Sequence, residues 1–166
     1  SENTAMGYNA GATTTTADNN TLIGSFAGTS ITTGSSNVMV GRFAGGGVES
    51  EGNNTGIGRN AMSSLNLSGG EFNVAIGNNT LDALTSGDAN SALGYAAGSS
   101  VTTGIENVFL GEGAGGQLTT GDGNIFIGQN TGSVNSGGGA FAVTGSASIY
   151  IGYKVRGSAT NNNNEI

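Results

Sequence analysis

Carboxylates are the residues of this chain best suited to chemistry, and four of them recur at one position of a repeated pattern. Asp18, Glu71, Asp88 and Asp122 each stand two residues before an asparagine that opens a repeat. Carboxylate and amide oxygens suit calcium, so Asp88, Asp122 and the neighbouring asparagines form a candidate cation site between adjacent repeats. The same position is typical of a turn, where an aspartate caps the chain and stays solvated. We favour the turn.

The rest of the composition offers little to a catalyst. The chain has no histidine and no cysteine, which removes the usual general base, the usual zinc ligands and any disulfide. An enzyme needs acids, bases or nucleophiles that converge, whereas these carboxylates are spread along one edge of the repeats. We therefore expect no enzyme, no catalytic residue, no cofactor and no metal site, and a glycan depolymerase is the disfavoured alternative.

Charge and hydropathy exclude two further classes of partner. A net charge of −7 with only four Lys and Arg argues against nucleic-acid binding, which requires clustered basic residues. The chain has no run of 18 apolar residues, so we expect no membrane insertion. With 33 glycines, no proline and 35% hydrophobic residues, the composition is that of neither a disordered chain nor a collagen.

An internal repeat organises the whole sequence. The pattern Asn-x-x-aliphatic-Gly, as in NVFLG from Asn107, opens units at positions 3, 20, 37, 54, 73, 90, 107 and 124, and SIYIG opens a ninth unit at 148. The units are 17 residues apart, except for steps of 19 after 54 and 24 after 124. We interpret residues 1–166 as a single repeat array and as a fragment of a longer fibre.

Each unit predicts one short strand followed by tight turns. The segment after the asparagine is rich in β-branched residues and ends in glycine, and no unit can bury its aliphatic side chains alone. The fold class is therefore all-β, a β-solenoid or β-roll of about nine 17-residue coils. The repeated asparagine predicts a ladder in which each amide bonds the next coil. Binding of a sugar or a cation by this asparagine row is the alternative.

The strands are apolar on both faces, which predicts a parallel homo-oligomer. We expect the row of Ile127 to lie in the core and the row two residues after each asparagine to face partner chains. Three chains is the natural number for a fibre. The expected oligomer interface consists of Met39, Phe109, Phe126 and Tyr150.

Interruptions and threonine pairs are the remaining candidates for a binding role. Loops that lengthen two units carry binding in many solenoids, and Phe72, Phe141 and Tyr153 could stack on a sugar ring there. The alternative, which we favour, is that these aromatic residues fill gaps in broken coils. Threonine pairs such as Thr32-Thr33 would suit ice binding, but each precedes a glycine turn and is better explained by turn formation.

A resemblance adds to this interpretation. The units NVFLGEGAGGQLTTGDG from Asn107 and NVMVGRFAGGGVESEG from Asn37 resemble the repeats of bacteriophage tail fibres. They are more distantly similar to the left-handed parallel β-roll heads of trimeric autotransporter adhesins. The resemblance covers essentially the whole chain and implies a trimeric, elongated protein that attaches to surfaces.

The function that we expect is that of a structural and adhesive fibre segment, on a virion tail fibre or at a cell surface. Such a segment would project a receptor-binding tip, or contact a cell-surface glycan or protein receptor itself. The alternatives are a bacterial adhesin head, a self-assembling extracellular filament subunit, and an ice- or glycan-binding solenoid.

Overall fold

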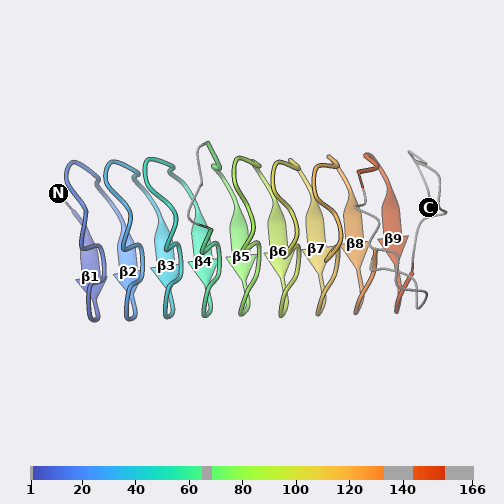
Figure 1. Cartoon of the computed structure of the whole chain (residues 1–166), viewed down its shortest axis with the longest axis horizontal. Helices are drawn as coiled ribbons and strands as arrows, with labels where there is room; N and C mark the ends of the chain where they lie inside the picture. The colour runs from blue at the N-terminus through green and yellow to red at the C-terminus, as the bar shows by residue number, and fades with distance from the viewer. Residues whose placement is uncertain (1, 65–68, 133–143, 156–166) are drawn as a thin grey trace.

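The computed structural model describes residues 2–64, 69–132 and 144–155. Within these ranges the chain contains no helix, and every strand has three residues. One strand follows another along a single axis, each on its own coil (Figure 1). The strands are β1 (Thr4–Met6), β2 (Thr21–Ile23), β3 (Val38–Val40), β4 (Thr55–Ile57), β5 (Val74–Ile76), β6 (Ser91–Leu93), β7 (Val108–Leu110), β8 (Ile125–Ile127) and β9 (Ile149–Ile151).

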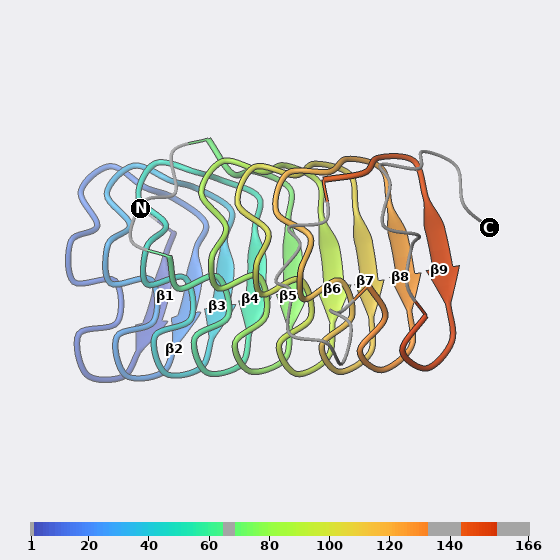
Figure 2. The ribbon, with the colours of Figure 1, turned by 45° about the vertical axis from the view of Figure 1, so that its right-hand side comes forward.

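The strands form one parallel sheet in the order of the sequence. Equivalent residues of successive units are paired, as in Leu22 with Met39 and Phe109 with Phe126. Each strand begins one residue after the start of a unit, and Figure 2 shows the coils stacked behind one another as a rod. Nine strands at about 4.8 Å per step give a ladder of roughly 38 Å. The predicted all-β solenoid is confirmed.

The asparagine that opens each unit forms the predicted ladder inside the coil. Asn90 is fully buried, and its Oδ1 accepts hydrogen bonds from the backbone N–H and Nδ2 of Asn107 at 3.1 and 3.0 Å. Its own Nδ2 donates to the carbonyl oxygen of Gly104 at 2.8 Å. The bond from a backbone N–H to the preceding Asn Oδ1 recurs from Asn20 to Ser148. These amides are structural, because burial and mutual bonding close them to a ligand.

Glycine after each strand is required by the spacing of the coils. Gly24 has φ of 132°, and a Cβ there would lie 2.6 Å from the carbonyl oxygen of Gly41 in the next coil. The equivalent glycines of the other units meet the same obstacle, down to Gly128 against Gly152. The last residue of the repeated pentapeptide is therefore glycine because neighbouring backbones pass too closely for a side chain.

The directions in which the strand side chains point contradict the predicted oligomer interface. The middle residue of each strand points into the coil, and its two neighbours point outward, as the burial of β2 to β9 shows. Ile127, expected in the core, is therefore an outward residue. The predicted interface residues are core residues with at most 5% of their surface exposed, and the prediction was wrong for all of them: Met39, Phe109, Phe126 and Tyr150.

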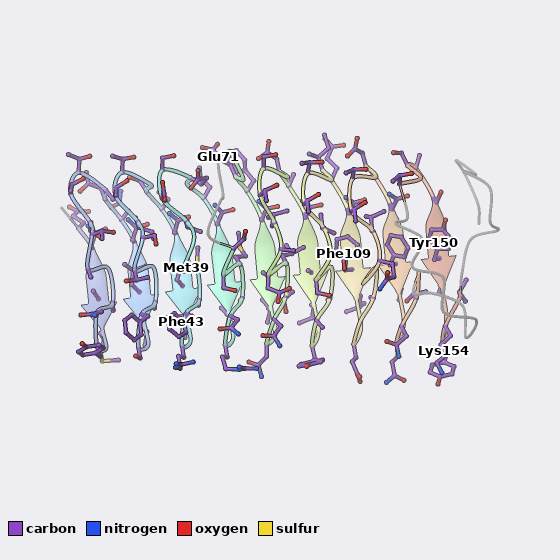
Figure 3. All side chains as sticks on the ribbon, in the orientation of Figure 1. Met39, Phe43, Glu71, Phe109, Tyr150 and Lys154 are labelled. Atoms are coloured by element: carbon purple, nitrogen blue, oxygen red, sulfur yellow. The ribbon has the colours of Figure 1, made fainter. Side chains whose placement is uncertain are left out.

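Inside the coil these side chains stack on one another. The rings of Phe109 and Phe126 lie 5.6 Å apart, and those of Phe126 and Tyr150 lie 4.7 Å apart, both nearly parallel. Figure 3 labels Met39, Phe109 and Tyr150 at the level of the strands, between the two edges of the rod. The aromatic row thus stabilises the stack of coils within one chain.

In most of the described coils two inward positions share one volume. Six residues after the large strand residues Leu22, Met39, Phe109 and Phe126 the chain has glycine, and a Cβ on Gly115 would overlap the ring of Phe109. Where the strand supplies Gly56 or Ala75, that later position holds buried Met62 or Leu81 instead. The exchange keeps the core filled, as close packing demands.

The side chain of Glu51 supplies a hydrogen-bond acceptor for backbone N–H groups just before the first lengthened unit. Its carboxylate is almost fully buried and accepts backbone hydrogen bonds from Glu49 at 2.8 Å and Ser50 at 3.0 Å. In a regular coil the equivalent N–H groups, those of Thr32 and Thr33, donate to a carbonyl of the next coil, that of Glu49. The side chain of Glu51 therefore stands in for a backbone carbonyl.

Candidate functional site

The acidic row lies at the edge of the sheet where the strands begin. Glu71 is labelled at this edge in Figure 3. Asp88 Oδ1 accepts the backbone N–H of Glu71 at 2.7 Å, and Asp122 Oδ1 accepts that of Ile105 at 2.9 Å. Both bonds run to the preceding coil, 17 residues back, so each aspartate joins two successive turns. In the described ranges, no group of three or more His, Cys, Asp or Glu is placed to hold a metal ion.

The aromatic residues expected at binding loops are not brought together. Phe72 precedes β5 and Tyr153 follows β9, so they lie at opposite edges of the sheet, and each is about two-thirds exposed. Phe72 also has a positive φ of 58°, a backbone conformation that is unfavourable for a bulky residue. Phe141 lies outside the described residues. Phe72 and Tyr153 are therefore separate exposed side chains.

The threonine pairs divide their roles. The first threonine donates to the next coil, as Thr32 Oγ1 does to the carbonyl of Glu49 and Thr102 Oγ1 to that of Thr119. The second, as in Thr33 and Thr103, is exposed. In the pairs that begin at Thr15, Thr32 and Thr102 the first hydroxyl is thus bonded along the axis of the rod.

Sequence reasoning missed an aromatic column at the edge where the strands end. Tyr8, Phe26 and Phe43 occupy one corner of successive coils; the first two rings meet edge to face at 5.3 Å, and the last two stack at 4.8 Å. The guanidinium of Arg42 lies 4.4 Å from the centre of the Phe43 ring. The sequence offered one sign of this column, because Phe26 and Phe43 occupy the same position of their units, six residues after the repeat asparagine.

A hollow of about 320 Å³ lies beside this column. It spans three coils, because Gly46 carries no side chain between Thr29 of the coil before and Ser63 of the coil after. Phe43 and Asn60 form its other wall. Hydroxyl groups, an amide and an aromatic ring make this a small, uncharged, mostly apolar site.

Asp82 is the one carboxylate among the described residues whose pKa departs clearly from its ordinary value. Burial raises the pKa of its carboxyl above the ordinary value, and a bond from its own backbone N–H offsets part of that effect. The buried Oδ1 has no hydrogen-bond partner in the part of the chain that the structure describes. A buried carboxylate oxygen without a hydrogen-bond partner affects the stability of the coil.

The outer face of the sheet is an exposed apolar surface of the described coils. The residue three after each unit start is aliphatic or methionine in all nine strands and points outward: Met6, Ile23, Val40, Ile57, Ile76, Leu93, Leu110, Ile127 and Ile151. We call these residues the outer aliphatic row. Leu93 and Leu110 are 49% and 42% exposed, and Ile151 is 63% exposed.

Comparison with known proteins gives no match: no family model, no curated protein and no solved structure is significantly similar to the chain. No helix in the described ranges is long and apolar enough to cross a membrane. The functional assignment therefore rests on the geometry of the coils and their surfaces.

Proposed function

We propose that this chain is a rigid structural and adhesive segment of a surface-attaching fibre, assembled as a parallel homotrimer on a virion tail fibre or at a cell surface. The observation that carries the proposal is the continuous ladder: nine parallel strands in register with a buried asparagine column beside them. Each coil bonds the next through backbone and side chain, so bending the rod would break several hydrogen bonds at once. The resemblance to tail-fibre repeats supports the same role.

The shape and mass of the chain in solution test this proposal. Small-angle X-ray scattering should give an elongated particle, and light scattering should give three times the chain mass of 16.1 kDa. A compact or flexible particle would contradict the rigid segment. A rod with the mass of a single chain would contradict the trimer alone.

A second candidate function, direct contact with a saccharide, is favoured by the hollow at Gly46. Its hydroxyl and amide groups match the hydrogen-bonding groups of an uncharged sugar, and Phe43 supplies an apolar contact for the C–H groups of a sugar ring. Gly46→Val would fill part of the hollow, and its Cβ would lie in tight contact with the carbonyl oxygen of Phe43, at 3.3 Å.

Glycan-array binding of the wild type and of this variant tests the saccharide contact. We expect a signal that Gly46→Val abolishes and that Gly116→Val, at the equivalent position of a coil without this hollow, retains. Equal binding by wild type and Gly46→Val, or none by either, would contradict the assignment.

A further inference from the structure

The outer aliphatic row is continuous from the first strand to the last. Each of its residues lies directly beside the equivalent residue of the next coil, as Leu110 lies beside Ile127 and Ile127 beside Ile151. The other outward row, one residue after each unit start, contains only valine, isoleucine, threonine and serine. Soluble chains that function alone rarely expose so long an apolar strip. The outer face of the sheet therefore requires a partner.

This face also carries no charge, in a chain whose net charge is −7. None of the described strands contains Asp, Glu, Lys or Arg. A second copy of this chain would be repelled by most of the acidic surface, but not by the sheet. The uncharged face is thus where two like-charged copies can approach closely.

Opposite charges border the two sides of this face. The edge where the strands begin carries Asp18, Glu71, Asp88, Glu106 and Asp122. The edge where the strands end carries Arg42, Arg59 and Lys154, with Glu112 as the one acidic residue in the same two rows of the described coils. Figure 3 shows Glu71 at the first edge and Lys154 at the second.

We propose that the sheet face binds a second copy of this chain with the two solenoid axes parallel. This inference rests on the proposed fibre function and adds the contact face and its polarity. Rotation about an axis parallel to the rod, by a half turn or a third of a turn, brings the acidic edge of one copy beside the basic edge of its neighbour. Reversing one rod places acidic edge against acidic edge. Charge complementarity therefore selects the parallel arrangement.

The absence of cysteine from the chain makes disulfide trapping a direct test. Ile23→Cys and Ile127→Cys each place one thiol in the outer aliphatic row, six units apart, or roughly 29 Å at about 4.8 Å per coil. After mild oxidation of the folded protein, each variant should form disulfide-linked pairs by itself. Ala12→Cys, exposed on a wall of the coil outside the sheet, should not.

Mixed samples determine the polarity. The two variants, distinguished by a mass tag on one of them, are unfolded together, refolded and oxidised. Parallel contact predicts only pairs of like variants, because unlike thiols would be too far apart for a disulfide. Predominant pairs of Ile23→Cys with Ile127→Cys would show antiparallel contact and overturn the proposed polarity.

A charge variant tests the proposed edge pairing. Arg42→Glu with Arg59→Glu should raise the concentration needed for half-assembly by roughly tenfold at low salt, and by less at high salt. An unchanged concentration would overturn the edge pairing.

If neither thiol variant forms pairs and the chain remains a rod of single-chain mass, the contact face is wrong while the rigid segment stands. A particle that is not a rod overturns the proposed function itself.

Discussion

The carboxylate of Glu51 accepts a hydrogen bond from the backbone N–H of Gly69, 18 residues further along, at 3.2 Å. The same carboxylate bonds the N–H groups of Glu49 and Ser50. One buried side chain thus links two turns on either side of the point where the repeat lengthens from 17 to 19 residues. The interruption is tolerated because a side chain supplies the acceptors that a regular coil takes from its neighbour.

Glu51→Ala should lower the free energy of unfolding by about 2–5 kcal/mol, because it leaves buried N–H groups without an acceptor. Glu51→Gln keeps one carbonyl acceptor and should lose less. Thermal and urea denaturation followed by circular dichroism measure both variants. Glu49→Ala, which alters an exposed neighbour, is the matched control and should remain close to the wild type. Equal stability of all three would show that Glu51 does not hold the interruption.

The asparagine ladder predicts a large loss from a single substitution in the middle of the rod. Asn90→Ala removes the acceptor of two bonds from Asn107 and the donor to Gly104. The expected cost is about 2–4 kcal/mol, measured by urea denaturation. Thr103→Ala, at an exposed position of the same coil, should cost less than about 0.5 kcal/mol. A small loss at Asn90 would mean that water replaces the ladder.

A side chain at position 115 would occupy the same volume as the ring of Phe109, so substitutions at the two positions should have coupled effects on stability. Gly115→Leu alone should prevent folding or destabilise strongly, because it overlaps the Phe109 ring and requires a positive φ of 63°. Adding Phe109→Ala should recover at least about 1 kcal/mol relative to the sum of the single effects, since the chain itself pairs Ala75 with Leu81. Unfolding free energies of the double-mutant cycle measure the coupling, and strict additivity would contradict the shared volume.

Because their side chains point in opposite directions, substitutions of two adjacent residues of β8 should have opposite outcomes. Phe126→Ser should destabilise the coil by about 3–5 kcal/mol, because Phe126 is fully buried between Phe109 and Tyr150. Ile127→Asp should leave the β circular-dichroism signal intact and reduce association, since Ile127 points outward. Denaturation and sedimentation separate the two effects. A folded, dissociated Phe126→Ser together with an unfolded Ile127→Asp would restore the opposite assignment of faces.

The raised pKa of Asp82 predicts that the effect of a substitution there on stability depends on pH. Burial raises the pKa of its carboxyl in the folded chain, so the folded state binds a proton more tightly than the unfolded state. Its contribution to stability is therefore lost as pH rises from its ordinary pKa of 3.8 through the folded value. Asp82→Asn should raise the Tm relative to the wild type at pH 7, and the difference should shrink below pH 3.8. The same Tm difference at both pH values would contradict this explanation.

Much of the fold could be predicted from the residues alone. Asn at the start of a unit and Gly at its fifth position are required by contacts that recur along the rod: the amide of Asn90 bonds the next amide, and Gly24 lies against the backbone of Gly41. Requirements of this kind leave a periodic signal. The solenoid and its parallel strands follow from that signal.

The direction of the side chains was decided only by the tertiary structure. All three residues of a strand such as β8 are apolar, so alternation cannot indicate which face is buried, and a shift of one residue exchanges the faces. The buried asparagine carried the missing information, because a residue two positions beyond an inward side chain also points inward.

The sequence by itself thus determined that the units stack, because that depends on local turns and a short period repeated along the chain. The tertiary structure alone decided what lies at the surface, because the corner occupied by Phe43 and Arg42, the hollow at Gly46 and the outward row of Leu110 arise only when equivalent positions of neighbouring coils meet. Those positions are 17 residues apart in the sequence and one strand spacing apart in space.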